Sequence, residues 1–152
     1  MALARLLGET SVPGFLEDHW LKQPLARAGG CLRLSSLGSW EALERLLARP
    51  EADSRASRHG ALWEGGRVAS GDAARALLAE GWTIGVRHAE RHDEGLATLA
   101  ASFREEFRAP IDVHLYCTPA RQPGLGWHYD AEEVFVLQTL GGKEWKLRKN
   151  TV

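Results

Sequence analysis

The chain has 152 residues, with 19 Lys and Arg against 20 Asp and Glu, and a formal net charge of −1. A hydrophobic fraction of 44% excludes a chain too polar to fold, and the balanced charge gives no electrostatic reason to expect nucleic-acid binding. No apolar run reaches the roughly 20 residues that a membrane helix needs. The start has no full signal-peptide pattern, and two cysteines make no disulfide framework, so we expect a cytoplasmic protein.

Region 1–109 is expected to form a helical layer. The spacing of its apolar residues predicts four helices, over residues 15–21, 40–48, 71–80 and from 94 up to Pro110. Ser39 and Asp93 are suitable N-caps for the second and fourth helices, because their side chains can accept hydrogen bonds from the first turn. Residues 51–71 are predicted to be a polar connection with little regular structure, and residues 82–86 a short strand.

From residue 110 onward the hydrophobic period changes from 3.6 to 2, which is typical of strands. Ile111, Val113 and Leu115 alternate with polar residues and predict a half-buried strand. Residues 132–139 are more apolar and predict a strand covered on both faces. After a hairpin turn at 141–142, residues 143–149 predict a third strand, with Trp145 and Leu147 on its buried face.

The segment Trp127-His128-Tyr129-Asp130 contains the most informative pattern in the sequence. On extended backbone, residues i and i+2 point to the same side, so His128 and Asp130 present an imidazole and a carboxylate together. Such a pair supplies two thirds of the two-histidine, one-carboxylate set that binds non-haem Fe(II). The His-x-Asp pattern alone occurs by chance in many proteins, so the pair is a candidate metal site that needs further support.

Lys143 and Tyr116 are candidate binding residues near this pair. Lys143 has the strand parity of Trp145, so its ammonium is expected to face the buried side, where an anion would have to compensate its charge. Tyr116 lies on the polar face of its strand and could donate to the same anion. The alternatives are a lysine that extends to solvent at the sheet edge and a tyrosine hydroxyl bound to backbone.

The sequence resembles the JmjC-type ribosomal oxygenases. The resemblance is dense over 110–148, from Val113-His114-Leu115-Tyr116-Cys117-Thr118-Pro119 through the 128–138 segment to Gly142-Lys143-x-Trp145, and a weaker likeness covers 15–25. Members of that family are cupin-fold enzymes that use Fe(II) and 2-oxoglutarate to hydroxylate protein side chains, notably on ribosomal proteins. The resemblance implies that His128 and Asp130 bind iron, that Lys143 binds the distal carboxylate of 2-oxoglutarate, and that Tyr116 is a hydrogen-bonding neighbour.

Two features depart from the family pattern. His114 stands where the family usually has Asn, and no histidine follows His128 to act as the family's third ligand. His114 is a candidate substitute ligand, although a hydrogen-bonded histidine in the sheet is the simpler interpretation. Zinc binding by His88, His92 and His128 is a further alternative, against a solvated loop in which Asp93 caps the next helix.

These observations predict an α+β protein in two regions. Residues 1–109 would form a helical layer, and residues 110–152 the first strands of a double-stranded β-helix that is truncated at its C-terminus. The expected function is Fe(II)/2-oxoglutarate-dependent hydroxylation of a protein or peptide side chain, with part of the site in this chain. The alternative is a non-catalytic cupin-like interaction module that lacks the third ligand. An open sheet edge predicts self-association, and neither membrane nor direct nucleic-acid binding is expected.

Overall fold

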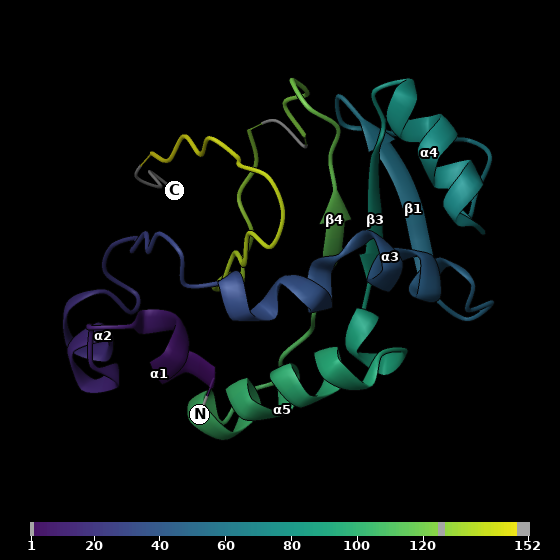
Figure 1. Ribbon diagram of the computed structural model, residues 1–152. Helices are drawn as coiled ribbons and strands as arrows, with labels where there is room; N and C mark the ends of the chain where they lie inside the picture. The colour runs from purple at the N-terminus through teal and green to yellow at the C-terminus, as the bar shows by residue number, and fades with distance from the viewer. Residues whose placement is uncertain (1, 125–126, 149–152) are drawn as a thin grey trace.

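The computed structural model describes residues 2–124 and 127–148 of the chain. It combines helices with one antiparallel sheet (Figure 1), so the mixed α+β composition predicted from the sequence is confirmed. Within these ranges, no helix is long and apolar enough to cross a membrane. The described strands form a single four-stranded sheet, and the double-stranded β-helix stays a prediction.

The sheet has the strand order β2-β1-β3-β4, and each neighbouring pair is antiparallel. Its strands are β1 (Asp53–Arg58), β2 (Ala61–Leu62), β3 (Thr83–Arg87) and β4 (Leu115–Cys117). Strand β3 confirms the short strand expected there. The prediction of little regular structure over 51–71 is wrong, because β1 and β2 form a hairpin within it. Strand β1 buries only Ser54 and Ala56, so it lacks the large apolar residues that mark a strand in sequence.

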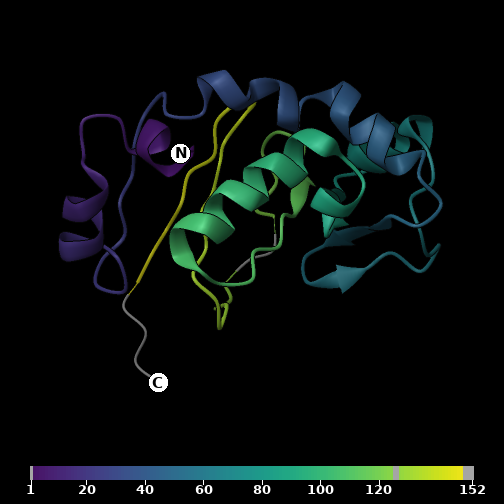
Figure 2. The same cartoon turned by 90° about the horizontal axis from the view of Figure 1, so that it is seen from below.

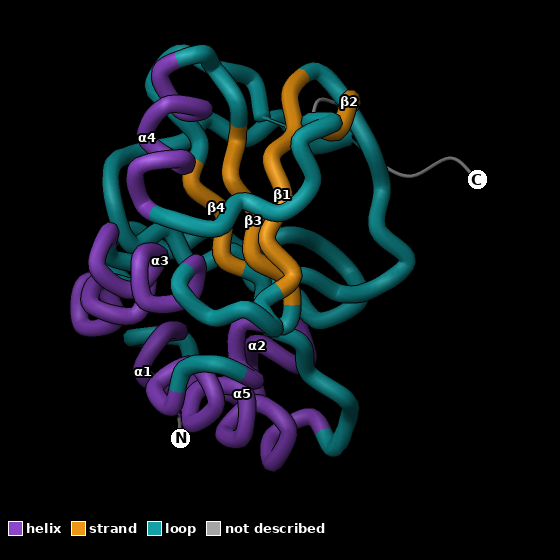
Figure 3. Tube along the Cα trace, turned by 90° about the vertical axis from the view of Figure 1, so that its right-hand side faces the viewer, coloured by secondary structure: helices purple, strands orange, loops and turns teal. Residues whose placement is uncertain are grey.

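The helices form two groups around the sheet. In chain order the helical elements are α1 (Ala2–Leu7), α2 (Val12–Asp18), the 3₁₀ helix η1 (Leu32–Gly38), α3 (Trp40–Leu47), α4 (Gly71–Ala79), the 3₁₀ turn η2 (Ala89–Arg91) and α5 (Glu94–Phe107). Helices α3 and α4 lie on one side of the strands, while α1, α2 and α5 gather at one end of the sheet (Figure 3). Within the described residues, the other face of the sheet therefore carries no helix.

Side-chain caps place the helix starts. Ser39 Oγ accepts from Ala42 N at 3.2 Å, and Asp93 Oδ1 accepts from Leu96 N at 3.1 Å, so both predicted N-caps are confirmed. The first predicted helix is displaced by three residues. Ser11 caps it, and it ends at Asp18 instead of 21, where Leu21 has a left-handed φ of 59°.

The main core lies between the sheet and helices α3, α4 and α5. Its buried members come from both layers and are Leu43, Leu46, Leu47, Ala52, Ala56, Val68, Ala74, Leu77, Ile84, Val86, Ala89 and Leu96. Leu115 and Cys117 of β4 pack against it. Because side chains alternate along a strand, Tyr116 between them points to the opposite, helix-free face.

A second core joins the N-terminal helices to the C-terminal segment. Leu3, Leu7, Phe15, Leu99 and Phe103 are buried there, and Phe135 packs against them. The ring of Phe135 lies 5.0 Å from that of Phe103 and 5.4 Å from that of Phe107. This contact attaches the extended C-terminal segments to α5, beside which they run in Figure 2.

The second and third strands predicted after residue 130 are not formed as paired strands in the described residues. Segment 132–139 is covered on one face only. Phe135, Leu137 and Thr139 are half-buried, whereas Val134 and Val136 are exposed, so the expectation of two covered faces is wrong. The period of 2 correctly predicted which side chains of this segment point inward. A central strand also needs a hydrogen-bonded neighbour and a layer packed on its other face, and the described residues supply neither.

Candidate functional site on the helix-free face of the sheet

The candidate site is built on the face of the sheet that carries no helix. Register places Arg55 of β1, Gly85 of β3 and Tyr116 of β4 in one row across the strands. The neighbouring row, Ser54, Val86 and Leu115, points into the core. The sequence predicted this parity for residues 111–117, and the alternation of half-buried and exposed residues there confirms it.

Gly85 makes room for the aromatic ring of Tyr116. A Cβ at position 85 would lie 3.0 Å from Tyr116 Cε1 and 3.2 Å from Cδ1, closer than ordinary van der Waals contact. The Tyr116 ring therefore lies close to the backbone of Gly85, in space that a larger residue at position 85 would occupy. Partial burial raises the pKa of the Tyr116 phenol, the positive charge of Arg87 opposes that rise, and the negative charge of Asp130 adds to it. The phenol is thus protonated and able to donate at neutral pH.

His128 and Asp130 lie together, as their i, i+2 spacing predicts. His128 Nε2 is 3.7 Å from Asp130 Oδ2, and both side chains are about half exposed. A metal with bonds of about 2.1 Å to each donor can join atoms up to roughly 4.2 Å apart. An imidazole nitrogen and a carboxylate oxygen suit Fe(II), so the pair fits two positions of an iron site. The electrostatic effect of Asp130 on Tyr116 connects this pair to the sheet face.

A third ligand does not join this pair within the described part of the chain. Among the described residues, three side chains of the metal-ligating types come close enough together to share an ion, and they are His88, Glu90 and Asp112. Neither His128 nor Asp130 belongs to that cluster. The candidate substitute, His114, instead lies beside Tyr116, with Nδ1 3.5 Å from the phenolic oxygen. Burial, followed by the nearby His88 and Arg87, lowers the pKa of His114, so its ring is neutral at pH 7. His114 thus lies directly before β4, next to the Tyr116 phenol and not next to the His128 and Asp130 pair.

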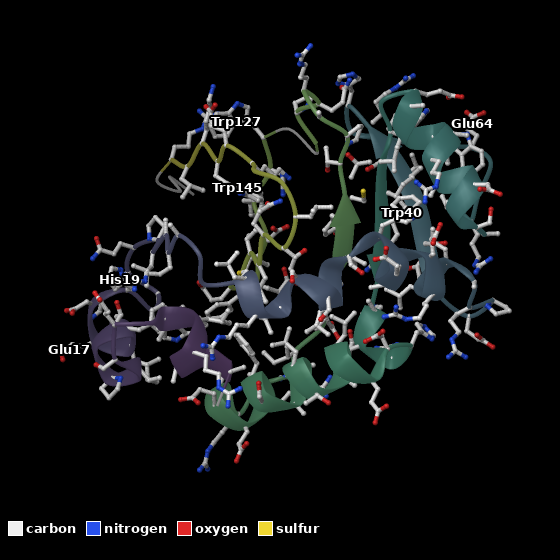
Figure 4. All side chains as sticks on the ribbon, viewed as in Figure 1. Glu17, His19, Trp40, Glu64, Trp127 and Trp145 are labelled. Carbon is white, nitrogen blue, oxygen red and sulfur yellow. The ribbon has the colours of Figure 1, made fainter. Side chains whose placement is uncertain are left out.

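Lys143 is exposed, contrary to the expectation that its parity places it on a buried face. Its ammonium lies 4.5 Å from the centre of the Trp145 ring, and Trp145 and Leu147 are themselves exposed by half or more. Lys143 Nζ also lies close to Gly124, at 3.4 Å from the place where a Cβ of residue 124 would stand. Figure 4 shows Trp127 and Trp145 on the same side of the molecule, away from Trp40 at the sheet. The described segments leave this face of residues 143–148 uncovered, which explains why strand parity did not predict burial.

A cluster that the sequence did not predict lies at the end of β3. His88, Glu90 and Asp112 each place one ligand atom within 4.8 Å of the others. Neither His92 nor His128 belongs to this cluster, so the zinc alternative based on His88, His92 and His128 is not assembled in the described residues. Parity places Asp112 on the same strand face as His114 and Tyr116, but the 3₁₀ turn that brings in Glu90 has no sequence pattern of its own.

Comparisons with known proteins agree with the class of protein that these features indicate. Residues 88–152 match the family model of the JmjC domain. This part of the chain is therefore similar to the JmjC domain, and the resemblance to the JmjC-type ribosomal oxygenases is confirmed.

Two curated relatives cover most of the chain. A bifunctional lysine-specific demethylase and histidyl-hydroxylase NO66 of Drosophila pseudoobscura pseudoobscura is 27% identical over 95% of this chain and 16% of its own length. The ribosomal protein uL16 3-hydroxylase of Escherichia coli (strain K12) is 29% identical over 89% of this chain and 36% of its own length. The chain thus spans well under half of the length of these relatives.

Proposed function

We propose that this chain contributes to an Fe(II)/2-oxoglutarate-dependent oxygenase that hydroxylates a protein side chain, with His128 and Asp130 as two of its iron ligands. The observation that carries the proposal is the 3.7 Å separation of His128 Nε2 and Asp130 Oδ2, beside a protonated Tyr116. The names of the relatives, a histidyl-hydroxylase and a ribosomal protein hydroxylase, support an oxygenase and suggest a ribosomal protein as substrate.

Iron with 2-oxoglutarate would supply the oxygen-activating chemistry. The residues of this chain would position the reactants. His128 and Asp130 would hold the metal, and the Tyr116 phenol, which Gly85 allows to lie against the sheet, would donate a hydrogen bond to a carboxylate of the co-substrate. Lys143 would add the positive charge for the distal carboxylate, which requires its ammonium to leave the Trp145 ring.

A non-catalytic interaction module is the second candidate. It is favoured by one observation, that no third His, Cys, Asp or Glu ligand joins His128 and Asp130 in residues 2–124 and 127–148. An enzyme that lost its third ligand would keep the His-x-Asp pair as an inherited feature and bind iron weakly.

Oxidation of 2-oxoglutarate distinguishes the two. In its described residues this chain holds only two of the proposed iron ligands, and it is expected to be inactive alone, so the oxygenase that contains it is incubated with Fe(II), 2-oxoglutarate and air. Succinate is measured with and without a ribosomal-protein peptide mixture. The oxygenase predicts succinate that disappears in Asp130→Ala and persists in His59→Asn, a control histidine in the β1–β2 turn whose left-handed backbone Asn tolerates. No succinate above the level of Asp130→Ala would favour the interaction module.

A further inference from the structure

We propose that His88, Glu90 and Asp112 form a zinc site that fastens the turn after β3 to the strand leading into β4. The three residues come from two chain segments, with His88 and Glu90 at the turn η2 and Asp112 in the segment before β4. This cluster is separate from the His128 and Asp130 pair, and the proposal does not depend on the oxygenase function.

One backbone–backbone and one backbone–side-chain hydrogen bond hold the two segments together independently of any metal. Ala89 N donates to Val113 O at 2.7 Å, and Val113 N donates to Glu90 Oε2 at 2.8 Å. The second of these bonds fixes the orientation of the Glu90 carboxylate, whose other oxygen, Oε1, lies 3.6 Å from Arg91 Nε. Hydrogen bonds of this kind orient metal ligands in known sites. The frame of the cluster is therefore already set.

The donor atoms have spacings that a small adjustment can convert into a metal site. His88 Nδ1 lies 3.2 Å from Asp112 Oδ1, and all three ligand atoms lie within 4.8 Å of one another. Zinc bonds of about 2.1 Å place tetrahedral donors roughly 3.4 Å apart. Asp112 is exposed at its side chain, so rotation about its bonds can supply the remaining movement.

One buried polar atom in the cluster lacks a hydrogen bond in the described part of the chain, and one buried carboxylate lies beside it. His88 Nδ1 is shielded from solvent and makes no hydrogen bond with the described residues, despite its short distance to Asp112. Glu90 is only 7% exposed, and its ion-pair partner Arg91 is 3.6 Å away on a largely exposed side chain. A buried ring nitrogen without a hydrogen bond is costly, and the Glu90 carboxylate, although it accepts from Val113 N, still places a negative charge in a buried position. A cation bound between them would satisfy both.

The charges and donor types select the cation. Two carboxylates and a neutral imidazole carry a charge of about −2, which a divalent cation balances. The neighbouring Arg87 is already paired with Asp53, its Nη1 3.7 Å from Asp53 Oδ2. Calcium needs six to eight oxygen ligands, whereas one nitrogen and two oxygens with an open fourth position suit zinc. The exposed side of Asp112 leaves that fourth position to water.

The test measures zinc binding in the full chain with the iron pair removed by His128→Ala and Asp130→Ala. Competition with a chromophoric chelator is expected to show one zinc per chain, and zinc is expected to raise the thermal midpoint. Adding Asp112→Asn should weaken zinc binding by roughly tenfold or more and abolish the thermal shift. Asp72→Asn, an exposed carboxylate in the first turn of α4, is the matched control and should leave both unchanged.

His88→Asn is a second ligand variant. Asn tolerates the left-handed backbone of this position, where φ is 50°, so the variant is expected to fold and to lose zinc in the same way. Glu90 is left intact because its buried carboxylate also holds Val113 N. Absence of zinc binding in the chain that lacks His128 and Asp130 would overturn the proposal. Equal zinc affinity before and after Asp112→Asn and His88→Asn would also overturn it.

Discussion

His128 Nε2 lies 3.7 Å from Asp130 Oδ2, on a segment that is attached to the helices by Phe135 rather than by strand pairing. The two donors therefore depend on aromatic packing at some distance for their position. The negative charge of Asp130 also raises the pKa of the Tyr116 phenol on β4. The candidate site thus joins two parts of the molecule that are held by different cores.

Phe135→Ala should destabilise the protein and release the segment that carries the candidate ligands. Phe135 contacts the rings of Phe15, Trp20, Phe103 and Phe107. Removing a core phenylalanine costs about 3 kcal/mol in free energy of unfolding. Urea denaturation measures the loss. Val134→Ala, next in sequence but 60% exposed, should change stability by less than about 0.5 kcal/mol. Equal effects of the two variants would contradict the packing described.

Gly85→Ala should displace the Tyr116 ring. The added methyl would lie 3.0 Å from Tyr116 Cε1, so the half-exposed ring must shift, which should cost about 1 kcal/mol, the lower end of the range for overpacking. Adding Tyr116→Ala should relieve the clash, so the double variant should be less destabilised than the sum of the single variants. Gly142→Ala is the control, because a Cβ there meets no atom within 4 Å. Additive effects of Gly85→Ala and Tyr116→Ala in urea denaturation would show that the ring does not lie on this glycine.

Arg67→Met should destabilise the end of α3. The guanidinium of Arg67 donates to three backbone carbonyls, that of Leu47 at the end of the helix and those of Arg49 and Ala52 beyond it. Losing charged hydrogen bonds of this kind costs about 1.5–3 kcal/mol. Arg33→Met, an exposed arginine, should be nearly neutral. Thermal or urea unfolding that failed to separate the two variants would show that these hydrogen bonds contribute little.

Asp53→Asn should reduce stability at neutral pH and lose its effect in acid. The hydrogen bond from Arg55 lowers the pKa of Asp53 below its ordinary value of 3.8, despite an opposing effect of burial, and the charges of Arg55 and Arg87 lower it further. The folded state therefore favours the ionised form, so this contribution is present above pH 3.8 and is lost as pH falls through the folded pKa.

The expected difference between wild type and Asp53→Asn is under about 1 kcal/mol at pH 7, because the ion pairs of Asp53 are partly exposed. Urea denaturation from pH 7 down to pH 3 should show this difference shrinking toward zero. Glu64→Gln, which removes an exposed carboxylate that has no ion pair within the described residues, should show no difference at pH 7. A difference for Asp53→Asn that grew in acid would contradict the account.

Local patterns predicted much of the fold, and the failures have physical causes. Helical period and N-caps placed α3, α4 and α5, and a period of 2 correctly sorted the inward and outward residues from Ile111 to Cys117. Strand β1 could not be predicted, because its position rests on pairing with β3 and not on its own hydrophobicity. The same spacing that predicted Phe135 as inward could not show that the opposite face stays exposed.

At the candidate site, the i, i+2 rule brought His128 and Asp130 together, and strand parity placed Tyr116 on the open face. Parity misplaced Lys143, because burial depends on what covers a face, and Lys143 rests on Trp145 at the surface. The cluster of His88, Glu90 and Asp112 joins a 3₁₀ turn to the segment that precedes β4, which is distant along the chain. Contacts of that kind follow from tertiary structure, which no local pattern specifies.

The most direct test of the central claim is an anaerobic titration of the chain with Fe(II) in the presence of 2-oxoglutarate, followed by visible absorption. Chelation of iron by the keto acid in a two-ligand protein site should produce a weak charge-transfer band that is absent without 2-oxoglutarate. The account predicts this band in the wild type and in His59→Asn, and its loss in His128→Ala and in Asp130→Ala. A band of equal strength in all four proteins, or no band in the wild type, would contradict the assignment of His128 and Asp130 as iron ligands.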